Sequence, residues 1–313
     1  MRYRPLGDTG LQVSEISLGT AEIGLDYGFK GNSHYAKPDV KESIRLVQRA
    51  LDHGINFIDT ARVYGNSEEV IGQAIAGMSS LPYISSKVLL SKDAAQKDSV
   101  SLREEIFGSI EASLKALRLD RLDLLLIHNT DLQHLRRPEI RHCLEEAQRQ
   151  GKVRFIGASC YGVEAPVEVL EQPAFRVLQV PFNLLDQKMN DQIFPSATAR
   201  SVGIVVRSAY LRGVLTGQVE SIPERLAPLK PRALSALTLL GDEVRSLAEA
   251  ALRFCLSMPV SSVVIGVKTV AELNANLVDA ERGVLPEQFI PELQSLSFGH
   301  DRIVDTRTWQ DLI

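Results

Sequence analysis

LDLLLIHNTDLQHLRRPEIRHCLEEAQRQGKVRFIGA (122–158) contains two short, mostly apolar runs separated by an amphipathic segment. The runs, LDLLLIH (122–128) and RFIGA (154–158), are typical of parallel strands that are buried on both faces. Between them, Pro138 to Gln150 carries the mixture of apolar and charged residues expected of a helix that covers a sheet. The stretch therefore predicts one strand–helix–strand unit.

The same unit recurs along the 313 residues of the chain. The predicted strands are 16–19, 56–59, 83–87, 122–128, 154–158, 177–181, 203–207 and 262–266. The predicted helices are 39–53, 67–76, 99–117, 138–150, 163–171, 191–199, 242–257 and 269–281. Eight units favour an α/β fold of the closed (β/α)8 TIM barrel type over a doubly wound sheet, which has about six strands and a glycine-rich first turn. We expect residues 1–313 to form a single barrel domain.

Three segments lie outside this alternation. Residues 2–13 contain two extended runs around Gly-Asp-Thr-Gly, and we expect a β-hairpin that closes the bottom of the barrel. Residues 24–38 and 212–233 show no strand or helix pattern and follow the first and seventh strands. Loops at those positions lie at the C-terminal face, where barrel enzymes carry their active sites. We interpret them as covers for a substrate or cofactor, with surface insertions of no function as the alternative.

The composition argues against several classes of partner. The chain has 35 Lys+Arg against 39 Asp+Glu, a formal net charge of −4, so we expect no nucleic-acid partner. It has no run of 18 apolar residues and no signal peptide, which favours a cytoplasmic protein without a membrane partner. Cys143, Cys160 and Cys255 have neither CxxC nor metal-ligand spacing, so we expect reduced thiols and no metal. A small-molecule substrate is the expected partner, and the sequence carries no signal for the oligomeric state.

Polar residues stand where the predicted strands end. In chain order these ends are Gly19, Asp59, Lys87, His128, Ser159, Gln179 or Pro181, Arg207 and Gly266. Asp59, Tyr64, Lys87 and His128 come from three successive strands and are expected to converge. An ammonium beside a phenol favours the phenolate, an aspartate keeps that ammonium charged, and an imidazole can polarise a carbonyl oxygen. The set predicts carbonyl reduction by hydride transfer with Tyr64 as the acid. Taken singly, such residues more often have structural roles: an aspartate after a strand caps a helix, a lysine extends into solvent, and a histidine at a strand end is hydrogen-bonded in the core.

Four segments closely resemble the aldo-keto reductase family: GINFIDTARVYGNSEEVIGQAI (54–75), ISSK (84–87), LDLLLIHNTD (122–131) and GKVRFIGAS (151–159). The resemblance extends from RPLGDTGLQVSEISLGT (4–20) to SSVVIGVKTVAELNANL (261–277). It implies a (β/α)8 barrel that binds a nicotinamide cofactor, usually NADPH. It also implies a catalytic Asp, Tyr, Lys and His set, which falls on Asp59, Tyr64, Lys87 and His128.

The resemblance also implies a set of cofactor contacts. The family's positions around the nicotinamide and ribose fall on Gly19, Thr20, Asp59, Ser159 and Gln179, those around the pyrophosphate on Ser208, Tyr210 and Gly213, and those at the adenosine end on Gly266, Lys268, Thr269, Glu272 and Asn276. Two residues depart from the pattern: Cys160 replaces a usual asparagine, and Arg207 replaces an aromatic that often stacks on the nicotinamide. Lys268 favours NADPH, whereas Glu272 would repel a 2′-phosphate, so NADPH is expected with NADH as the alternative.

The substrate and the direction of reaction are less defined. The mouth of the pocket is expected to involve Tyr27, Phe29, His34 and Tyr35 of the first long loop and Trp309 near the carboxy terminus, unless these pack against the barrel rim. The charges of Arg207, Arg212 and Lys30 favour sugar-like or anionic carbonyl substrates. Two alternatives stay open: an aldose or polyol dehydrogenase that works mainly in oxidation, and a redox-sensing regulatory subunit that binds the cofactor, as some channel subunits related to this family do.

Overall fold

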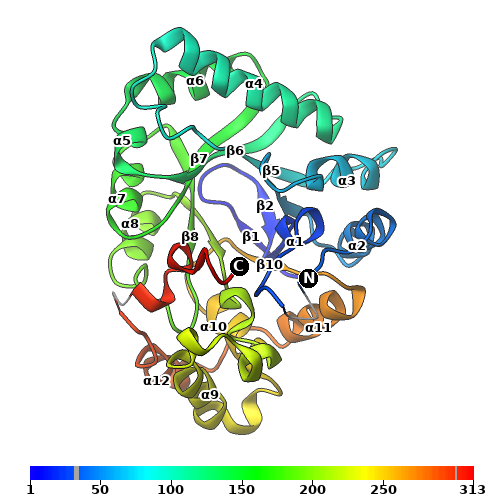
Figure 1. Ribbon diagram of the computed structural model, residues 1–313, viewed down its shortest axis with the longest axis vertical. Coiled ribbons are helices and arrows are strands. Elements are labelled where there is room, and N and C mark those ends of the chain that lie inside the picture. Colours follow the sequence, from blue (N-terminus) through cyan, green and yellow to red (C-terminus); the bar gives the residue numbers. More distant parts are fainter. Residues whose placement is uncertain (32–34, 300–301) are drawn as a thin grey trace.

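The computed structural model describes residues 1–31, 35–299 and 302–313. Eight parallel strands close into a barrel in the order β10-β3-β4-β5-β6-β7-β8-β9, with helices outside it (Figure 1). The strands are β3 (Ile16–Gly19), β4 (Phe57–Asp59), β5 (Tyr83–Val88), β6 (Leu122–Thr130), β7 (Val153–Cys160), β8 (Phe175–Pro181), β9 (Gly203–Arg207) and β10 (Ser262–Gly266). The predicted (β/α)8 barrel is confirmed.

Several of the helices that cover the barrel begin at a side chain that accepts a backbone N–H group. Asp39 accepts from Glu42 N before α2, and Thr269 accepts from Glu272 N before α11, so both predicted starts hold. The helices are α1 (Ala21–Gly24), α2 (Val40–Asp52), α3 (Ser67–Ala74), α4 (Ser99–Leu117), α5 (Leu132–Leu135), α6 (Pro138–Arg149), α7 (Glu164–Leu170), α8 (Ile193–Ala199), α9 (Leu229–Leu240), α10 (Leu247–Leu256), α11 (Val270–Glu281) and α12 (Ile290–Gln294). Within the described ranges, no helix is both long and apolar enough to cross a membrane.

The segment between β9 and β10 differs from its prediction. The predicted loop 212–233 contains three short 3-10 turns and the start of α9, and the predicted helix 242–257 begins only at Leu247. The prolines of PLKPR (228–232) are typical of a loop, but they occupy the N-cap and the first turn of α9, where a missing N–H costs little. Ser246 accepts from Glu249 N and so fixes the later start of α10.

Two apolar layers hold the barrel together. The inner cluster lies inside the barrel and consists of Leu6, Leu11, Val13, Phe57, Leu124, Leu126, Val177 and Val205. Leu125 and Ile127, which alternate with the inner leucines of β6, belong to the larger outer cluster beneath the helices.

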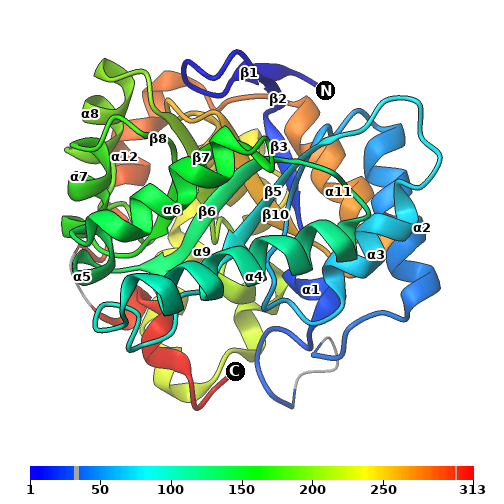
Figure 2. The same cartoon turned by 90° about the horizontal axis from the view of Figure 1, so that it is seen from above.

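The amino-terminal hairpin seals one end of the barrel. Strand β1 (Tyr3–Pro5) pairs antiparallel with β2 (Gln12–Ser14), which confirms the predicted hairpin. Its apolar residues Leu6, Leu11 and Val13 are at most 2% exposed and complete the inner cluster. The hairpin lies at the end of the barrel opposite the carboxy terminus (Figure 2). The open end of the barrel is therefore the end at which the carboxy terminus lies.

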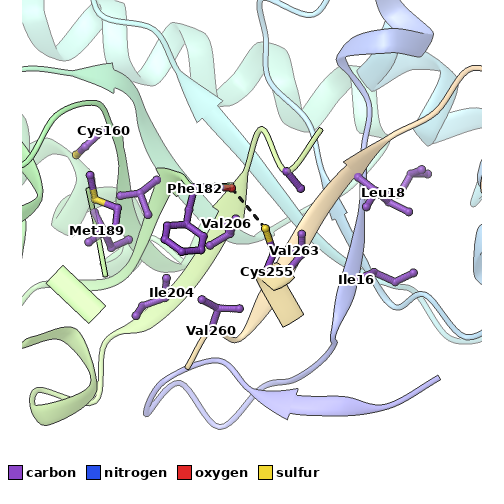
Figure 3. Close-up of a cluster of buried hydrophobic side chains, with 14 of the residues drawn as sticks. Ile16, Leu18, Cys160, Phe182, Met189, Ile204, Val206, Cys255, Val260 and Val263 are labelled. Carbon is purple, nitrogen blue, oxygen red and sulfur yellow. Dashed lines mark hydrogen bonds between the residues drawn. The ribbon is translucent and has the colours of Figure 1, made fainter. Parts of the chain in front are cut away.

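The three cysteines are buried, unpaired thiols. Cys255 on α10 donates to the carbonyl of Phe182 at 3.6 Å, among valines and isoleucines of β9 and β10 (Figure 3). Burial raises the pKa of Cys143 and Cys255 and raises that of Cys160 to about 12. Because the reactive form of cysteine is the thiolate, these side chains act as small apolar residues of the core.

Candidate active site

Polar side chains form the layer of the barrel interior above the inner cluster. In four strands an apolar residue of that cluster is followed two positions later by a polar one: Phe57 by Asp59, Leu126 by His128, Val177 by Gln179 and Val205 by Arg207. Side chains two positions apart in a strand point to the same face. The barrel therefore turns from apolar to polar toward the carboxyl ends of its strands, as the sequence predicted.

Lys87 is the centre of this polar layer. Its Nζ donates to Asp59 Oδ2 at 2.6 Å, to the carbonyl of Thr60 at 2.9 Å and to Tyr64 Oη at 3.4 Å. Burial alone lowers the pKa of Lys87, but the charge of Asp59 and the hydrogen bonds to Asp59 and Tyr64 outweigh it, so the pKa lies above its usual value. Lys87 is therefore a buried ammonium held against a phenol.

His128 faces the same phenol from β6. Its Nε2 lies 3.5 Å from Tyr64 Oη, and the two rings meet edge to face with centroids 5.6 Å apart. Burial and the charges of Lys87 and Arg207 lower the pKa of His128 to about 2. The imidazole is therefore neutral at physiological pH and can donate one hydrogen bond to an oxygen in the barrel mouth.

Gln179 connects Asp59 to the opposite side of the barrel. Its Nε2 donates to Asp59 Oδ1 at 2.8 Å, and its buried Oε1 has no hydrogen-bond partner among residues 1–31, 35–299 and 302–313. Ser159 pairs with Gln179 in the register of β7 and β8. A buried amide oxygen without a donor costs free energy, so this position is suited to a ligand that carries an N–H group.

Part of this polar layer lines a cavity of about 630 Å³, which we call the strand-end cavity. Its walls include Asp59, Tyr64, His128, Tyr161 and Arg207. The carboxy-terminal segment covers it with Thr306, Gln310 and Ile313. Trp309 does not line the cavity: it is fully buried, donates from Nε1 to the carbonyl of Ile303 at 3.0 Å and packs on Phe29. It anchors the segment rather than the pocket mouth.

Arg207 occupies the end of β9. Its guanidinium stacks on the ring of Tyr161 at 4.0 Å, and it donates from Nε to Ser159 Oγ at 3.4 Å and from Nη2 to the carbonyl of Cys160 at 3.3 Å. Arg307 lies over the Tyr161 ring as well, at 4.6 Å, and is paired with Asp305. The ring on which Arg207 stacks in this structure is thus a tyrosine of the protein itself.

A second hollow of about 580 Å³, which we call the outer cavity, adjoins the first. Glu22, Tyr27, Tyr210, Arg212, Gly213 and Gly266 line both. Lys268, Glu272 and Asn276 line the outer cavity alone, where Asn276 Oδ1 accepts from the Tyr210 hydroxyl at 2.8 Å. The two cavities form one continuous path from the strand ends to the start of α11.

Lys268 and Glu272 are already engaged at that helix start. Lys268 Nζ donates to the carbonyls of Tyr27 at 2.8 Å and Tyr35 at 2.9 Å, and thereby ties down the first long loop. Glu272 Oε2 accepts from the backbone N–H of Lys268 at 2.8 Å, and Thr269 caps the helix. A carboxylate thus occupies part of the positive end of α11.

Glu22 is a site residue that the sequence did not suggest. A Cβ on Gly266 would lie 2.1 Å from Glu22 Oε1, so the glycine leaves room for this carboxylate. Burial raises the pKa of Glu22 to about 7, with Glu272 adding to the effect and Lys268 and Arg212 opposing it. The group therefore changes charge near neutral pH. Its only sequence signal is its position three residues after β3.

The remaining predicted residues lie along the same path or at its edge. Gly19 ends β3 and Thr20 follows it, with Thr20 Oγ1 donating to the carbonyl of Asp59, and Ser208 stands in the left-handed region after β9. Lys30 is exposed and outside both cavities, and His34 lies outside the described residues. Sequence reasoning also missed Tyr161 and Thr306. Tyr161 was detectable as the residue just after a strand end, whereas nothing marks Thr306.

The sequence model of the Aldo/keto reductase family matches residues 15–297. The chain is 31% identical over 223 residues to the aldo-keto reductase YhdN of Bacillus subtilis, across 70% of this chain and 65% of that protein. It is 27% identical over 288 residues to the L-galactose dehydrogenase of Arabidopsis thaliana, across 88% and 87% of the two chains. The holo form of an aldo-keto reductase from Bacillus halodurans has the same fold, with a TM-score of 0.78 at 24% identity over 95% and 96% of the chains.

Proposed function

Because this chain belongs to the Aldo/keto reductase family, we propose that it reduces an aldehyde or ketone to the alcohol with a nicotinamide cofactor, and that Tyr64 donates the proton. The observation that carries the proposal is the contact of Tyr64 Oη with both Lys87 Nζ and His128 Nε2, at 3.4 and 3.5 Å. The phenol is the one group of the set that can lose a proton to substrate, since Lys87 is committed to Asp59 and His128 is neutral.

Each neighbour of Tyr64 has a distinct part in this proposal. The Lys87 ammonium stabilises the phenolate that remains after the proton has moved. Asp59 keeps that ammonium charged and in place, and Gln179 in turn orients Asp59. His128 donates from Nε2 to the carbonyl oxygen of the substrate, which polarises the carbonyl and brings its oxygen to the phenol. All four act before or during a single proton transfer.

The residues present fit a nicotinamide cofactor. The buried Oε1 of Gln179, without a partner among the described residues, can accept a hydrogen bond from the N–H of a carboxamide. From Asp59, the hydrogen-bond partner of Gln179, the strand-end cavity and then the outer cavity run past Gly213 and Gly266 to the start of α11. When bound, the nicotinamide supplies the hydride that adds to the carbonyl carbon. The protein's own residues position the carbonyl and deliver the proton.

We propose NADPH as the preferred cofactor, with NADH as an accepted one. Thr269 and the backbone at the start of α11 favour a phosphate, and Lys268 adds a positive charge. Glu272 works against a 2′-phosphate because its carboxylate lies at the same helix start. Steady-state kcat/KM with each cofactor tests the preference, and a higher value with NADH would overturn it.

A second candidate is the oxidation of an aldose or polyol by the same groups. The similarity to a relative named L-galactose dehydrogenase favours it. In that direction Tyr64 would act as the base and accept the proton of a hydroxyl group, since a group that donates in one direction accepts in the other. Initial rates in both directions, measured over aldehydes and free sugars at equal cofactor concentrations, distinguish the two.

The replacement Tyr64→Phe tests the proposed proton donor. It removes one hydroxyl, so we expect a fall in kcat of about 10²- to 10⁴-fold, the usual contribution of a general acid, with cofactor binding retained. Absorbance of the reduced cofactor follows turnover, and quenching of protein fluorescence follows binding. A variant with the wild-type rate would refute the assignment. A wild-type protein that binds the cofactor and turns over no carbonyl or alcohol would instead support a regulatory subunit.

A further inference from the structure

Arg207 is a cation in the strand-end cavity that has no carboxylate partner in the described part of the chain. Across residues 1–31, 35–299 and 302–313, no carboxylate lies within 4.0 Å of its guanidinium. Its hydrogen bonds to Ser159 and Cys160 are long, at 3.4 and 3.3 Å. The buried Arg253, by contrast, is paired with both Glu243 and Glu249. The Arg207 side chain is half-buried, and a guanidinium that is partly removed from water normally has such a partner, because an unpaired charge away from water is costly.

The ionisable partner of that cation is the Tyr161 phenol, and among the described residues no other charged group of the cavity is paired with it. Lys87 is neutralised by Asp59 at 2.6 Å, and His128 is neutral. The positive charge of Arg207 contributes to the low pKa of His128, so it is felt where the substrate carbonyl would be held. At the outer end of the cavity, the cations whose charges act on the Glu22 carboxyl are Lys268 and Arg212, not Arg207.

The guanidinium is also fixed in orientation. Tyr161 lies against its face at 4.0 Å, and Arg307 lies over the same ring at 4.6 Å. Arg307 is held by two hydrogen bonds to Asp305 Oδ2 and one to Oδ1, so the stack is anchored at its outer end. A guanidinium with a fixed plane presents a rigid fork of N–H donors, which matches the two oxygens of a carboxylate.

We propose that Arg207 binds an anionic group of the substrate, so that the preferred substrate is a small aldehyde or ketone that also carries a carboxylate. The inference rests on the proposed carbonyl reduction and names its substrate class. Tyr161 holds the fork, Arg207 binds the carboxylate, and Tyr64 and His128 bind the carbonyl. A phosphate shares the same chemistry and is distinguished by the test. The competing role for Arg207, stacking on the nicotinamide, makes a different prediction, a loss of cofactor affinity.

The test compares two aldehydes of nearly equal size, 4-formylbenzoate and 4-formylbenzamide, at saturating cofactor. A charge-assisted hydrogen bond is worth about 1.5–3 kcal/mol, so we expect the wild-type protein to prefer the benzoate by roughly 10- to 150-fold in kcat/KM, mainly through KM. In Arg207→Met this ratio should fall to near one. Arg207→Lys, which keeps the charge and loses the fork, should retain part of it.

Arg136→Met is the matched control, because it removes the same group at an exposed position, paired with Glu168, that lies outside the strand-end cavity and away from the Tyr161 stack. It should keep both the ratio and the turnover. A second comparison measures kcat/KM for glyceraldehyde 3-phosphate and for glyceraldehyde. If this ratio exceeds that of the benzoate to the benzamide, the site is assigned to phosphate rather than carboxylate. Inhibition of the wild-type protein by benzoate, but not by benzamide, tests the same site without any variant.

The outcomes separate this inference from the proposed function. Reduction of 4-formylbenzamide without any preference for the benzoate would overturn the role of Arg207 and leave carbonyl reduction intact. No turnover of any aldehyde would overturn the proposed function itself. A ratio that survives Arg207→Met, together with a cofactor dissociation constant raised more than tenfold, would assign Arg207 to the nicotinamide instead.

Discussion

The buried pair of Asp59 and Lys87 makes a prediction about stability that is separate from catalysis. The two groups lie 2.6 Å apart, and their side chains are 5% and 0% exposed. Removing one partner of such a pair strands the other charge in the interior, which usually costs about 3–5 kcal/mol of unfolding free energy. We therefore expect Asp59→Asn and Lys87→Met each to lower the free energy of unfolding by about that amount.

The double variant Asp59→Asn/Lys87→Met removes both charges at once. Since replacing a whole buried pair is often nearly neutral, we expect it to recover most of the loss, to within about 1–2 kcal/mol of the wild-type protein. The remaining contacts support this, because Gln179 Nε2, which donates to Asp59 Oδ1 at 2.8 Å, can also donate to the amide oxygen that the substitution introduces. Carbonyl reduction should stay lost in all three variants.

Urea unfolding followed by circular dichroism and tryptophan fluorescence measures the effect, with the slope of each transition compared before the free energies are. The reasoning would be refuted if the two single losses added up in the double variant. It would also fail if either single variant lost less than about 1 kcal/mol, because the pair would then behave as a surface ion pair.

Individual side chains make three further predictions. Unfolded histidine takes up a proton below about pH 6.5, whereas folded His128, with a pKa of about 2, does not. The free energy of unfolding should therefore fall as the pH drops below 6.5, by at most about 1.4 kcal/mol per pH unit. Urea titrations at several pH values measure this dependence, and His128→Gln should remove it. Glu22, with a pKa of about 7, is neutral below that pH and anionic above it, so its negative charge should repel the cofactor phosphates at higher pH. Cofactor affinity, measured by fluorescence quenching, should weaken about three- to fivefold from pH 6 to 8. Glu22→Gln should show no such change with pH. Trp309→Ala should lower the free energy of unfolding by about 3–5 kcal/mol and raise KM, because the segment that covers the cavity loses its buried anchor. An unchanged unfolding midpoint would contradict this.

The strands and the polar layer were predictable because both follow from local rules. Apolar runs buried on two faces identify the strands, and the polar residue at each strand end identifies the layer. Asp59, Lys87, His128 and Gln179 all come from strand ends. The structure places them in one hydrogen-bonded group together with Tyr64, which follows β4 by five residues. The family resemblance carried by these same segments is confirmed.

The contacts made by loops were not predictable, because they join residues that are distant in the chain. The Lys268 ammonium holds carbonyls of Tyr27 and Tyr35, which lie 241 and 233 positions earlier. Tyr161 meets Thr306 across 145 positions. Every residue has a backbone carbonyl, so the residue type does not indicate which carbonyl will accept a long-range hydrogen bond from a side chain. Helix α9 was missed for a local reason. Its prolines predict a loop, but they stand at the N-cap and in the first turn, where proline is compatible with a helix.

The burial of all three thiols has a practical consequence for following the first long loop. With Cys143, Cys160 and Cys255 enclosed and their pKa values raised, the folded protein offers no ready thiolate to a maleimide. A cysteine introduced at the exposed Lys30 would then take a fluorophore selectively, in an otherwise unaltered chain. The native cysteines need not be removed, so a change in the surroundings of residue 30 during ligand binding can be recorded on the protein with its core intact.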